Sequence, residues 1–306
     1  MDSYADRLSA AILDKDSRVC VGLDPRIEAL PAPLADMAGA GPEEAARAYR
    51  EFCCEIIEAI AQYAPAVKPQ AAFFEALGPA GYAALWDVIT HAGKTGLLVI
   101  LDAKRSDIGS TAAAYAQAYF RPGHTSHGPD AVTVNGYLGG DGIAPFVQAA
   151  TECGGGIYVL AKTSNPSSGQ LQDLACDAPG GVRRVYEHMG SLIAEWGREH
   201  IGAQGYSAVG AVVGATYPEQ LHELRAALPS VQFLVPGYGA QGAGAPQVVG
   251  AFDARGLGAV VNSSRGIIFA YQGHSQAPQS SHKAYAQAAA HAAAAMRDAI
   301  NEALAL

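Results

Sequence analysis

The chain has 306 residues, half of them hydrophobic, which suffices for one large buried core and does not require two. Its formal net charge of −9 lacks the basic surplus that binding to nucleic acid or an anionic membrane needs. The first residues show no secretory signal, no apolar stretch reaches membrane-spanning length, and the five cysteines have no metal-binding spacing. We expect one cytoplasmic domain, residues 1–306, with free thiols and no nucleic-acid or membrane partner.

Eight short apolar runs alternate with Ala-rich segments of helical spacing. Continuous apolar runs are typical of parallel strands buried on both faces, and eight such units in about 250 residues favour a closed barrel. The alternative is an open doubly wound sheet, which normally has a Gly-rich turn where this chain has CVGLDP. We therefore predict an α/β fold, a (β/α)8 TIM barrel. The predicted strands are 19–23, 66–68, 97–101, 131–134, 156–160, 208–213, 232–235 and 259–262.

Two connections between these strands are longer than a single helix requires. They cover residues 24–65 and 161–207, and we expect extra helices in both and at the termini. Within the first connection, the apolar residues of 43–61 recur at helical intervals. Residues 271–281 are polar and predict a linker into a final Ala-rich helix over 283–306.

Polar residues close most of the predicted strands. Barrel enzymes carry their working groups at the carboxyl ends of the strands. One polar residue there can serve as a cap, but acids and bases on neighbouring strands are costly to bury, which favours a functional site over a structural network. The strand-end residues in question are Asp24, Lys68, Asp102, Lys104, Asp107, Thr163, Ser164, Asn262 and Arg265.

Asp102 and Lys104 are two residues apart on the third predicted strand. Side chains of an extended strand alternate between its faces, so an acid and a base should reach the barrel mouth together. Asp107 falls where the chain turns into a helix, and its alternative role is an ordinary helix N-cap.

One run of residues resembles a known active-site signature. LDAKRSDIGST, residues 101–111, contains Asp-x-Lys-x-x-Asp followed by Ile-x-x-Thr and is similar to the orotidine 5'-monophosphate decarboxylase family. The resemblance extends over the predicted barrel and is greatest to the longer, bacterial-type subgroup. It implies a cofactor-free homodimeric lyase that converts orotidine 5'-monophosphate to UMP and CO2 in pyrimidine biosynthesis. The other matching segments are CVGLDP at 20–25, VKPQAAFFE at 67–75, TSNP at 163–166, VPGYGAQG at 235–242 and NSSRGI at 262–267.

The same resemblance implies roles for individual residues. Lys104 would protonate C6 of the pyrimidine and Asp102 would face the scissile carboxylate. Lys68 would bind the ribose and join the acid/base cluster, and Asp24 would also bind the ribose. Asp107 would complete the cluster in the neighbouring subunit's site. The remaining implied contacts are Ile108 and Thr111 from that neighbour, Ser164 or alternatively Thr163 at the pyrimidine, Pro236 and Gln241 on a closing loop, and Arg265 with Gly266 at the phosphate.

The chemistry of the reaction fits these residue types. Loss of CO2 from C6 leaves an electron pair that the ring delocalises poorly, so a fixed positive charge is needed beside that carbon. Carboxylates on both sides of Lys104 favour its ammonium form, which supplies both the charge and the proton. Asp102 has two candidate roles, repulsion of the substrate carboxylate and orientation of Lys104.

Two further features of the sequence predict a phosphate-binding site. Arg265 with Gly266 follows the last predicted strand, where barrels commonly bind phosphate. The glycine-rich segment 236–246 carries Gln241 and is expected to close over the ligand, with a solvated connector as the alternative.

Two other classes share parts of this pattern. Sugar-phosphate decarboxylases and aldolases with Asp-x-Lys-x-x-Asp use magnesium and need another metal-binding acid, and a phosphate-sensing barrel would lack part of the charged cluster. His124 and His127 have a short spacing but lie in a Gly/Pro loop without convergent carboxylates. We expect neither a metal nor a cofactor.

Overall fold

The computed structural model describes residues 2–120, 128–239, 242–273 and 284–305. His124, His127 and Gln241, to which the sequence drew attention, lie outside these residues. Within them, no helix combines the length and apolarity that crossing a membrane requires.

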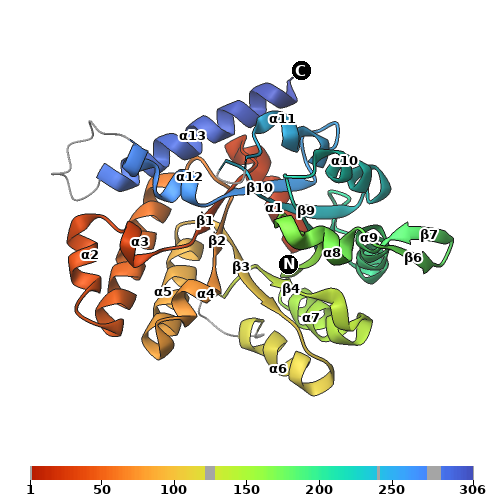
Figure 1. Cartoon of the computed structure of the whole chain (residues 1–306), viewed down its shortest axis with the longest axis horizontal. Helices are drawn as coiled ribbons and strands as arrows, with labels where there is room; N and C mark the ends of the chain where they lie inside the picture. Colours follow the sequence, from red (N-terminus) through yellow and green to blue (C-terminus); the bar gives the residue numbers. More distant parts are fainter. Residues whose placement is uncertain (1, 121–127, 240–241, 274–283, 306) are drawn as a thin grey trace.

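Eight parallel strands close into a barrel in the order β1-β10-β9-β8-β5-β4-β3-β2 (Figure 1). This confirms the predicted (β/α)8 fold, and each predicted strand is present within a few residues of its expected bounds. The largest difference is at β3, which continues four residues past its predicted end. The barrel strands are β1 (Val19–Leu23), β2 (Ala66–Pro69), β3 (Leu98–Arg105), β4 (Ala131–Val134), β5 (Gly156–Lys162), β8 (Ser207–Val213), β9 (Val231–Pro236) and β10 (Ala259–Ser263).

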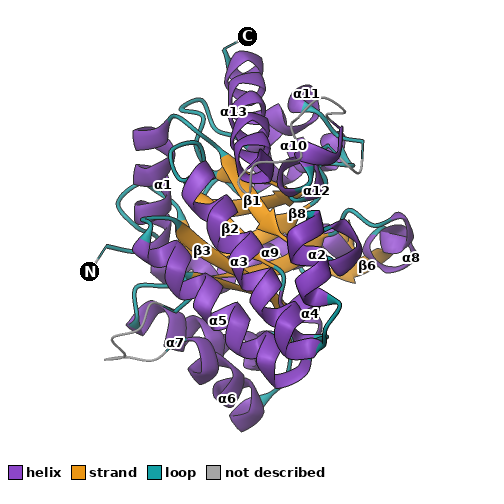
Figure 2. Ribbon diagram, turned by 90° about the vertical axis from the view of Figure 1, so that its left-hand side faces the viewer, coloured by secondary structure: helices purple, strands orange, loops and turns teal. Residues whose placement is uncertain are grey.

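Helices surround the strands on the outside of the barrel (Figure 2). Alternate strand residues face opposite sides, so Val19 and Val21 pack against the helical layer while Cys20 faces the barrel interior. The helices are α1 (Tyr4–Lys15), α2 (Ala32–Ala38), α3 (Pro42–Ile60), α4 (Ala71–Glu75), α5 (Gly78–Lys94), α6 (Gly109–Tyr119), α7 (Gly140–Glu152), α8 (Gly169–Gln172), α9 (Val185–Gly197), α10 (Pro218–Ala227), α11 (Ala245–Val248), α12 (Arg265–Ile268) and α13 (Ala284–Leu304).

Helix α1 closes the amino-terminal end of the barrel. Tyr4, Leu8 and Ile12 are spaced four residues apart, share one helical face, and join the cluster of side chains inside the barrel. The buried hydroxyl of Tyr4 lies 3.0 Å from that of Tyr158 in β5. With this end filled, the open end is the one at which the strands terminate.

The long connections contain the expected additions, with one difference. Between β1 and β2, α2 precedes α3, as predicted. Between β5 and β8, the short helix α8 is followed by an antiparallel hairpin, β6 (Ala175–Ala178) and β7 (Gly181–Arg184), which the sequence analysis did not predict. Gly180 and Gly181 at its turn have φ values of 93° and 119°, a conformation that glycine adopts without a steric cost. The hairpin projects away from the barrel (Figure 1).

Candidate active site

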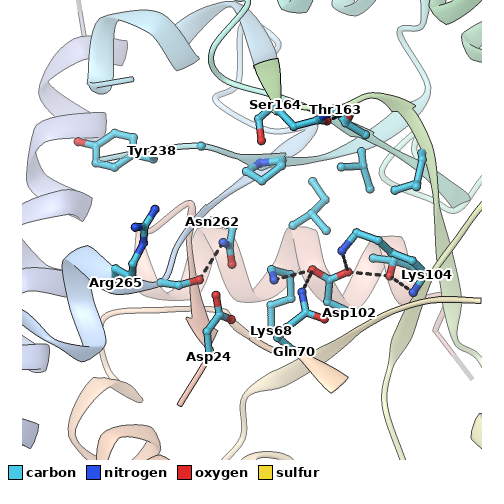
Figure 3. A pocket seen from close by; sticks show the side chains of 18 of the residues that line it. Asp24, Lys68, Gln70, Asp102, Lys104, Thr163, Ser164, Tyr238, Asn262 and Arg265 are labelled. Carbon is cyan, nitrogen blue, oxygen red and sulfur yellow. Dashed lines mark hydrogen bonds and ion pairs between the residues drawn. The ribbon is translucent and has the colours of Figure 1, made fainter. Parts of the chain in front are cut away.

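A cavity of about 470 Å³ lies at the carboxyl ends of the strands (Figure 3). It has a charged side at β2 and β3, an apolar floor, and an end that carries Arg265. Its lining residues are Asp24, Arg26, Lys68, Gln70, Asp102, Lys104, Thr133, Leu160, Thr163, Ser164, Asn165, Val212, Leu234, Pro236, Gly237, Tyr238, Asn262, Ser264 and Arg265.

The carboxylate of Asp102 is the centre of the charged side. Its Oδ2 accepts hydrogen bonds from Lys68 Nζ at 2.8 Å and Gln70 Nε2 at 2.9 Å, and its Oδ1 from Lys104 Nζ at 2.6 Å and Thr133 Oγ1 at 2.9 Å. Burial acts to raise the pKa of Asp102, but the charges of both lysines and their hydrogen bonds outweigh it and hold this pKa well below the usual range. Asp102 is therefore an anion at neutral pH although it is buried.

Lys68 is the inner of the two lysines, with only 5% of its side chain exposed. Its burial acts to lower its pKa, whereas the negative charges of Asp102 and Asp24 raise it, and the net direction is upward. Lys68 is thus a permanent cation that offsets the charge of Asp102.

Lys104 reaches Asp102 from an irregular part of β3. The pairing of β3 with β4 shifts between Leu101 and Arg105, and Lys104 has a φ of 46°, in the left-handed region that non-glycine residues rarely adopt. The expectation of a regularly alternating strand is therefore wrong here, although Asp102 and Lys104 still meet. The backbone N–H of Lys104 donates to Thr133 Oγ1 at 2.9 Å, which holds the bulge. The Lys104 side chain is 47% exposed and so remains accessible from the cavity.

The other end of the cavity combines a cation with unpartnered acceptors. Among the described residues, Asp24 Oδ1 and Asn262 Oδ1 are buried and accept no hydrogen bond. Both line the cavity, and Figure 3 shows them on the same side of it as Arg265. Buried acceptors without partners are costly, so these atoms fit ligand groups that donate hydrogen bonds, such as sugar hydroxyls. The Arg265 guanidinium fits an anionic group.

The middle of the cavity joins an apolar floor to a short polar loop. Leu160, Val212 and Leu234 form the floor, and Thr163 and Ser164 follow the end of β5. An apolar surface beside a few polar groups suits a flat heterocyclic ring.

The structure brings most of the predicted site residues to this cavity, but not all of them. Asp107, Ile108, Thr111 and Gly266 are not among its lining residues. Within the described residues, Asp107 Oδ1 accepts only from the adjacent backbone N–H of Ile108, at 2.8 Å, and the N-cap residue of α6 is Ile108. The alternative role of Asp107 as a helix N-cap is therefore wrong.

Sequence reasoning did not assign Gln70 or Thr133 to the site, and it named Asn262 only as a polar strand end without a role. Gln70 belongs to the KPQ wording of a matching segment and Asn262 closes a predicted strand, so both had a signal. Thr133 had a weaker one, as the single polar residue in the apolar run of β4.

Fold and site together define a (β/α)8-barrel enzyme whose mouth holds a buried carboxylate between two lysines. The chain belongs to the Orotidine 5'-phosphate decarboxylase / HUMPS family, whose model matches residues 17–280. This confirms the resemblance seen in the sequence motifs.

Individual relatives cover nearly the whole chain. Orotidine 5'-phosphate decarboxylase of Rhodopirellula baltica is 53% identical over 276 residues, 89% of this chain and 90% of the relative. The enzyme of the same name from Deinococcus radiodurans is 44% identical, with 88% and 90% covered. The solved structure of Leishmania donovani OMP decarboxylase matches with a TM-score of 0.71 and 33% identity, covering 98% of this chain and 99% of that one.

Proposed function

We propose that this chain converts orotidine 5'-monophosphate to UMP and CO2 in pyrimidine biosynthesis, with Lys104 as the proton donor. The observation that carries the proposal is the Asp102 carboxylate bound by two ammonium groups, those of Lys104 at 2.6 Å and Lys68 at 2.8 Å. This arrangement supplies a fixed charge and a transferable proton at one point of a cavity that also holds an anion-binding arginine.

The layout of the cavity supports one orientation of the substrate. The phosphate lies at Arg265, the ribose hydroxyls meet Asp24 and Lys68, and the pyrimidine rests on the apolar floor with Ser164 beside it. C6 of the ring, which carries the carboxylate, then faces Asp102 and Lys104. Binding energy from the phosphate, far from the reacting bond, is available to hold this orientation.

The reaction follows from this orientation. The bond between C6 and the carboxylate breaks, its electron pair stays on C6, and CO2 leaves. The ammonium group of Lys104 stabilises this pair and then transfers a proton to C6, forming the C–H bond of UMP. Lys104 regains its proton from water, which its partly exposed side chain can reach. Asp102 has two roles compatible with this geometry, orienting Lys104 and repelling the substrate carboxylate.

We further propose that the active unit is a homodimer in which Asp107, Ile108 and Thr111 enter the neighbouring site. A hollow of about 350 Å³ beside Asp102 and Lys104 offers room for such a segment. Ile108 is exposed, as are Tyr137 and Leu138. A Cβ built on Gly142 would lie 2.8 Å from Asp107 O and 3.6 Å from Leu138 Cβ, so these two residues lie on either side of Gly142 and apolar side chains flank the segment that would cross. Exposed large apolar side chains around one point are typical of an interface.

The remaining assignments concern the loop that closes over the ligand and the cellular compartment of the enzyme. Pro236 and Gln241 belong to the loop proposed to close over the ligand, and Gly266 lets the backbone beside Arg265 approach the phosphate. We propose that the chain works as one domain, residues 1–306, in the cytoplasm and without a cofactor. Its five free cysteines support a reducing compartment.

A direct assay tests the proposed activity. Orotidine 5'-monophosphate is added to the purified protein and its ultraviolet absorbance is followed, with release of CO2 measured in parallel. Conversion to UMP with matching CO2 release is expected. Unchanged absorbance with a folded protein would rule out the proposed function.

A further inference from the structure

The loop that follows β5 is closed at its base by two adjacent side-chain contacts. Lys162, the last residue of β5, pairs through Nζ with Asp173 Oδ1 at 2.7 Å. The next residue, Thr163, is bound twice by Gln172, whose Oε1 accepts from Thr163 N at 2.9 Å and whose Nε2 donates to Thr163 Oγ1 at 2.8 Å. We call these two contacts, Lys162 with Asp173 and Thr163 with Gln172, the clasp. From it we infer that Gln172 is a positioning residue that fixes the loop for recognition of the pyrimidine, an inference that rests on the proposed function.

The ion pair between Lys162 and Asp173 is the buried contact of the clasp, and it acts as an anchor for the loop. The Lys162 side chain is fully buried, and its ammonium group lies 4.4 Å from the ring centroid of Tyr217 and 5.6 Å from that of Tyr186. A buried ammonium needs a close partner, so Asp173 is held firmly in place. Because Gln172 precedes Asp173 directly, the anchor also fixes the residue that binds Thr163.

The clasp leaves one hydroxyl of the loop for a ligand. Thr163 Oγ1 accepts from Gln172 and donates to Asn165 Oδ1 at 2.6 Å, so its donor and one acceptor position are used. In the described part of the chain, no hydrogen bond to the hydroxyl of Ser164 is present, and Ser164 lines the cavity. Between the two residues that the sequence left open, this geometry selects Ser164 as the contact to the ring.

Further contacts hold the backbone of Ser164 from the opposite side. Thr216 Oγ1 donates to Ser164 O at 3.3 Å. Gly214 packs so closely that a Cβ there would lie 2.9 Å from Ser164 Cα. The loop is thus fixed on both sides, and Gln172 provides the two hydrogen bonds on one of them.

Preorganisation explains why this matters for the ring. A loop that is ordered before binding does not lose conformational entropy when the ligand arrives. Replacing Gln172 with Ala removes both hydrogen bonds to Thr163 and lets the loop sample other conformations. The resulting loss falls on contacts to the base, whereas the phosphate and ribose contacts lie elsewhere in the cavity.

Two ligands that differ only in the base test the inference. Inhibition constants for UMP and for ribose 5-phosphate are measured on Gln172→Ala, Gln172→Glu and the control Gln148→Ala, an exposed Gln whose side chain donates to Glu152. We expect Gln172→Ala to weaken the binding of UMP by about tenfold more than it weakens the binding of ribose 5-phosphate. Gln172→Glu, which keeps the acceptor for Thr163 N, should lose less, and Gln148→Ala should match the wild type.

Three results would overturn the inference. They are equal weakening of the binding of both ligands, no weakening of the binding of either, and a Gln172→Glu variant that binds UMP no better than Gln172→Ala. If Gln172→Ala does not fold, the Glu variant carries the comparison of the two ligands. Decarboxylation by the wild type is measured separately. An inactive wild type refutes the proposed function, whereas an active wild type with an unchanged ligand ratio refutes only the role of Gln172.

Discussion

Lys68 and Lys104 bind different oxygens of the same carboxylate, and they differ sharply in exposure. Lys68 is buried and approaches Oδ2 of Asp102, while Lys104 is half exposed and approaches Oδ1. A buried cation that keeps Asp102 ionised suits a structural counter-charge, whereas an accessible cation at the cavity suits the proposed role of proton donor. The two lysines should therefore respond differently to substitution.

Replacing Lys104 with Ala should nearly abolish turnover but leave the affinity for the product UMP almost unchanged. We expect kcat to fall by at least about 10³-fold, because the variant loses both the stabilising charge and the proton. UMP affinity should change little, since UMP has no carboxylate or carbanion at C6. Steady-state kinetics and UMP inhibition measure the two effects. Lys94→Ala, at the exposed end of α5, is the control, and undiminished turnover in Lys104→Ala would contradict the assignment.

Replacing Lys68 with Met should destabilise the fold as well as lower activity. The change leaves Asp102 buried with one charged partner fewer, which typically costs about 3–5 kcal/mol. Removing the carboxylate too, in Lys68→Met with Asp102→Leu, should restore much of the free energy of unfolding but no turnover. Urea denaturation of the single and double variants measures this. A double variant as unstable as the sum of both single variants would show that the residues are not coupled.

The depressed pKa of Asp102 predicts how its contribution to stability depends on pH. Because the folded pKa lies below that of the unfolded chain, the contribution is complete above the unfolded value and declines as pH falls through the folded value. The difference in free energy of unfolding between wild type and Asp102→Asn should be constant near neutral pH and shrink below about pH 4. Denaturation at a series of pH values tests this, and a difference that grows toward acid would be inconsistent with it.

Much of the fold could be predicted because buried parallel strands have a local signature. The strands from β1 to β10 that form the barrel are short apolar runs, and the polar residues after them indicate which end is the mouth. The β6–β7 hairpin gave no such signal, because its residues are largely exposed and lack a regular apolar pattern.

The composition of the charged cluster could be predicted only in part. Asp102 and Lys104 belong to one motif, but their contact depends on a bulge held by Thr133 from the next strand. Gln70 reaches Asp102 because β2 and β3 pair in a particular register. Such cross-strand relationships depend on tertiary pairing, which the spacing within one strand does not encode.

Chelation separates the proposed reaction from metal-dependent chemistry on the same barrel. No group of three or more His, Cys, Asp or Glu side chains suited to a metal ion occurs in the described residues. Because the proposed mechanism takes its positive charge and its proton from Lys104, turnover of orotidine 5'-monophosphate should be the same before and after prolonged treatment with EDTA. The rate is compared with that of a sample to which Mg²⁺ is returned. Activity lost to EDTA and recovered with Mg²⁺ would point to a bound metal instead.

Mixing two inactive variants tests whether Asp107 acts in the neighbouring site. In a dimer with shared sites, Lys104→Ala and Asp107→Ala place both defects in one site of the mixed species and leave the other site intact. Random exchange of subunits should then restore about a quarter of the wild-type activity, because half of the dimers are mixed and each has one working site. Lys104→Ala mixed with Asp102→Ala is the matched control. Those residues belong to the same chain's site, so no intact site can form and no activity should return. If a mixture of Lys104→Ala and Asp107→Ala stays inactive after verified subunit exchange, Asp107 does not act in the active site of the neighbouring subunit.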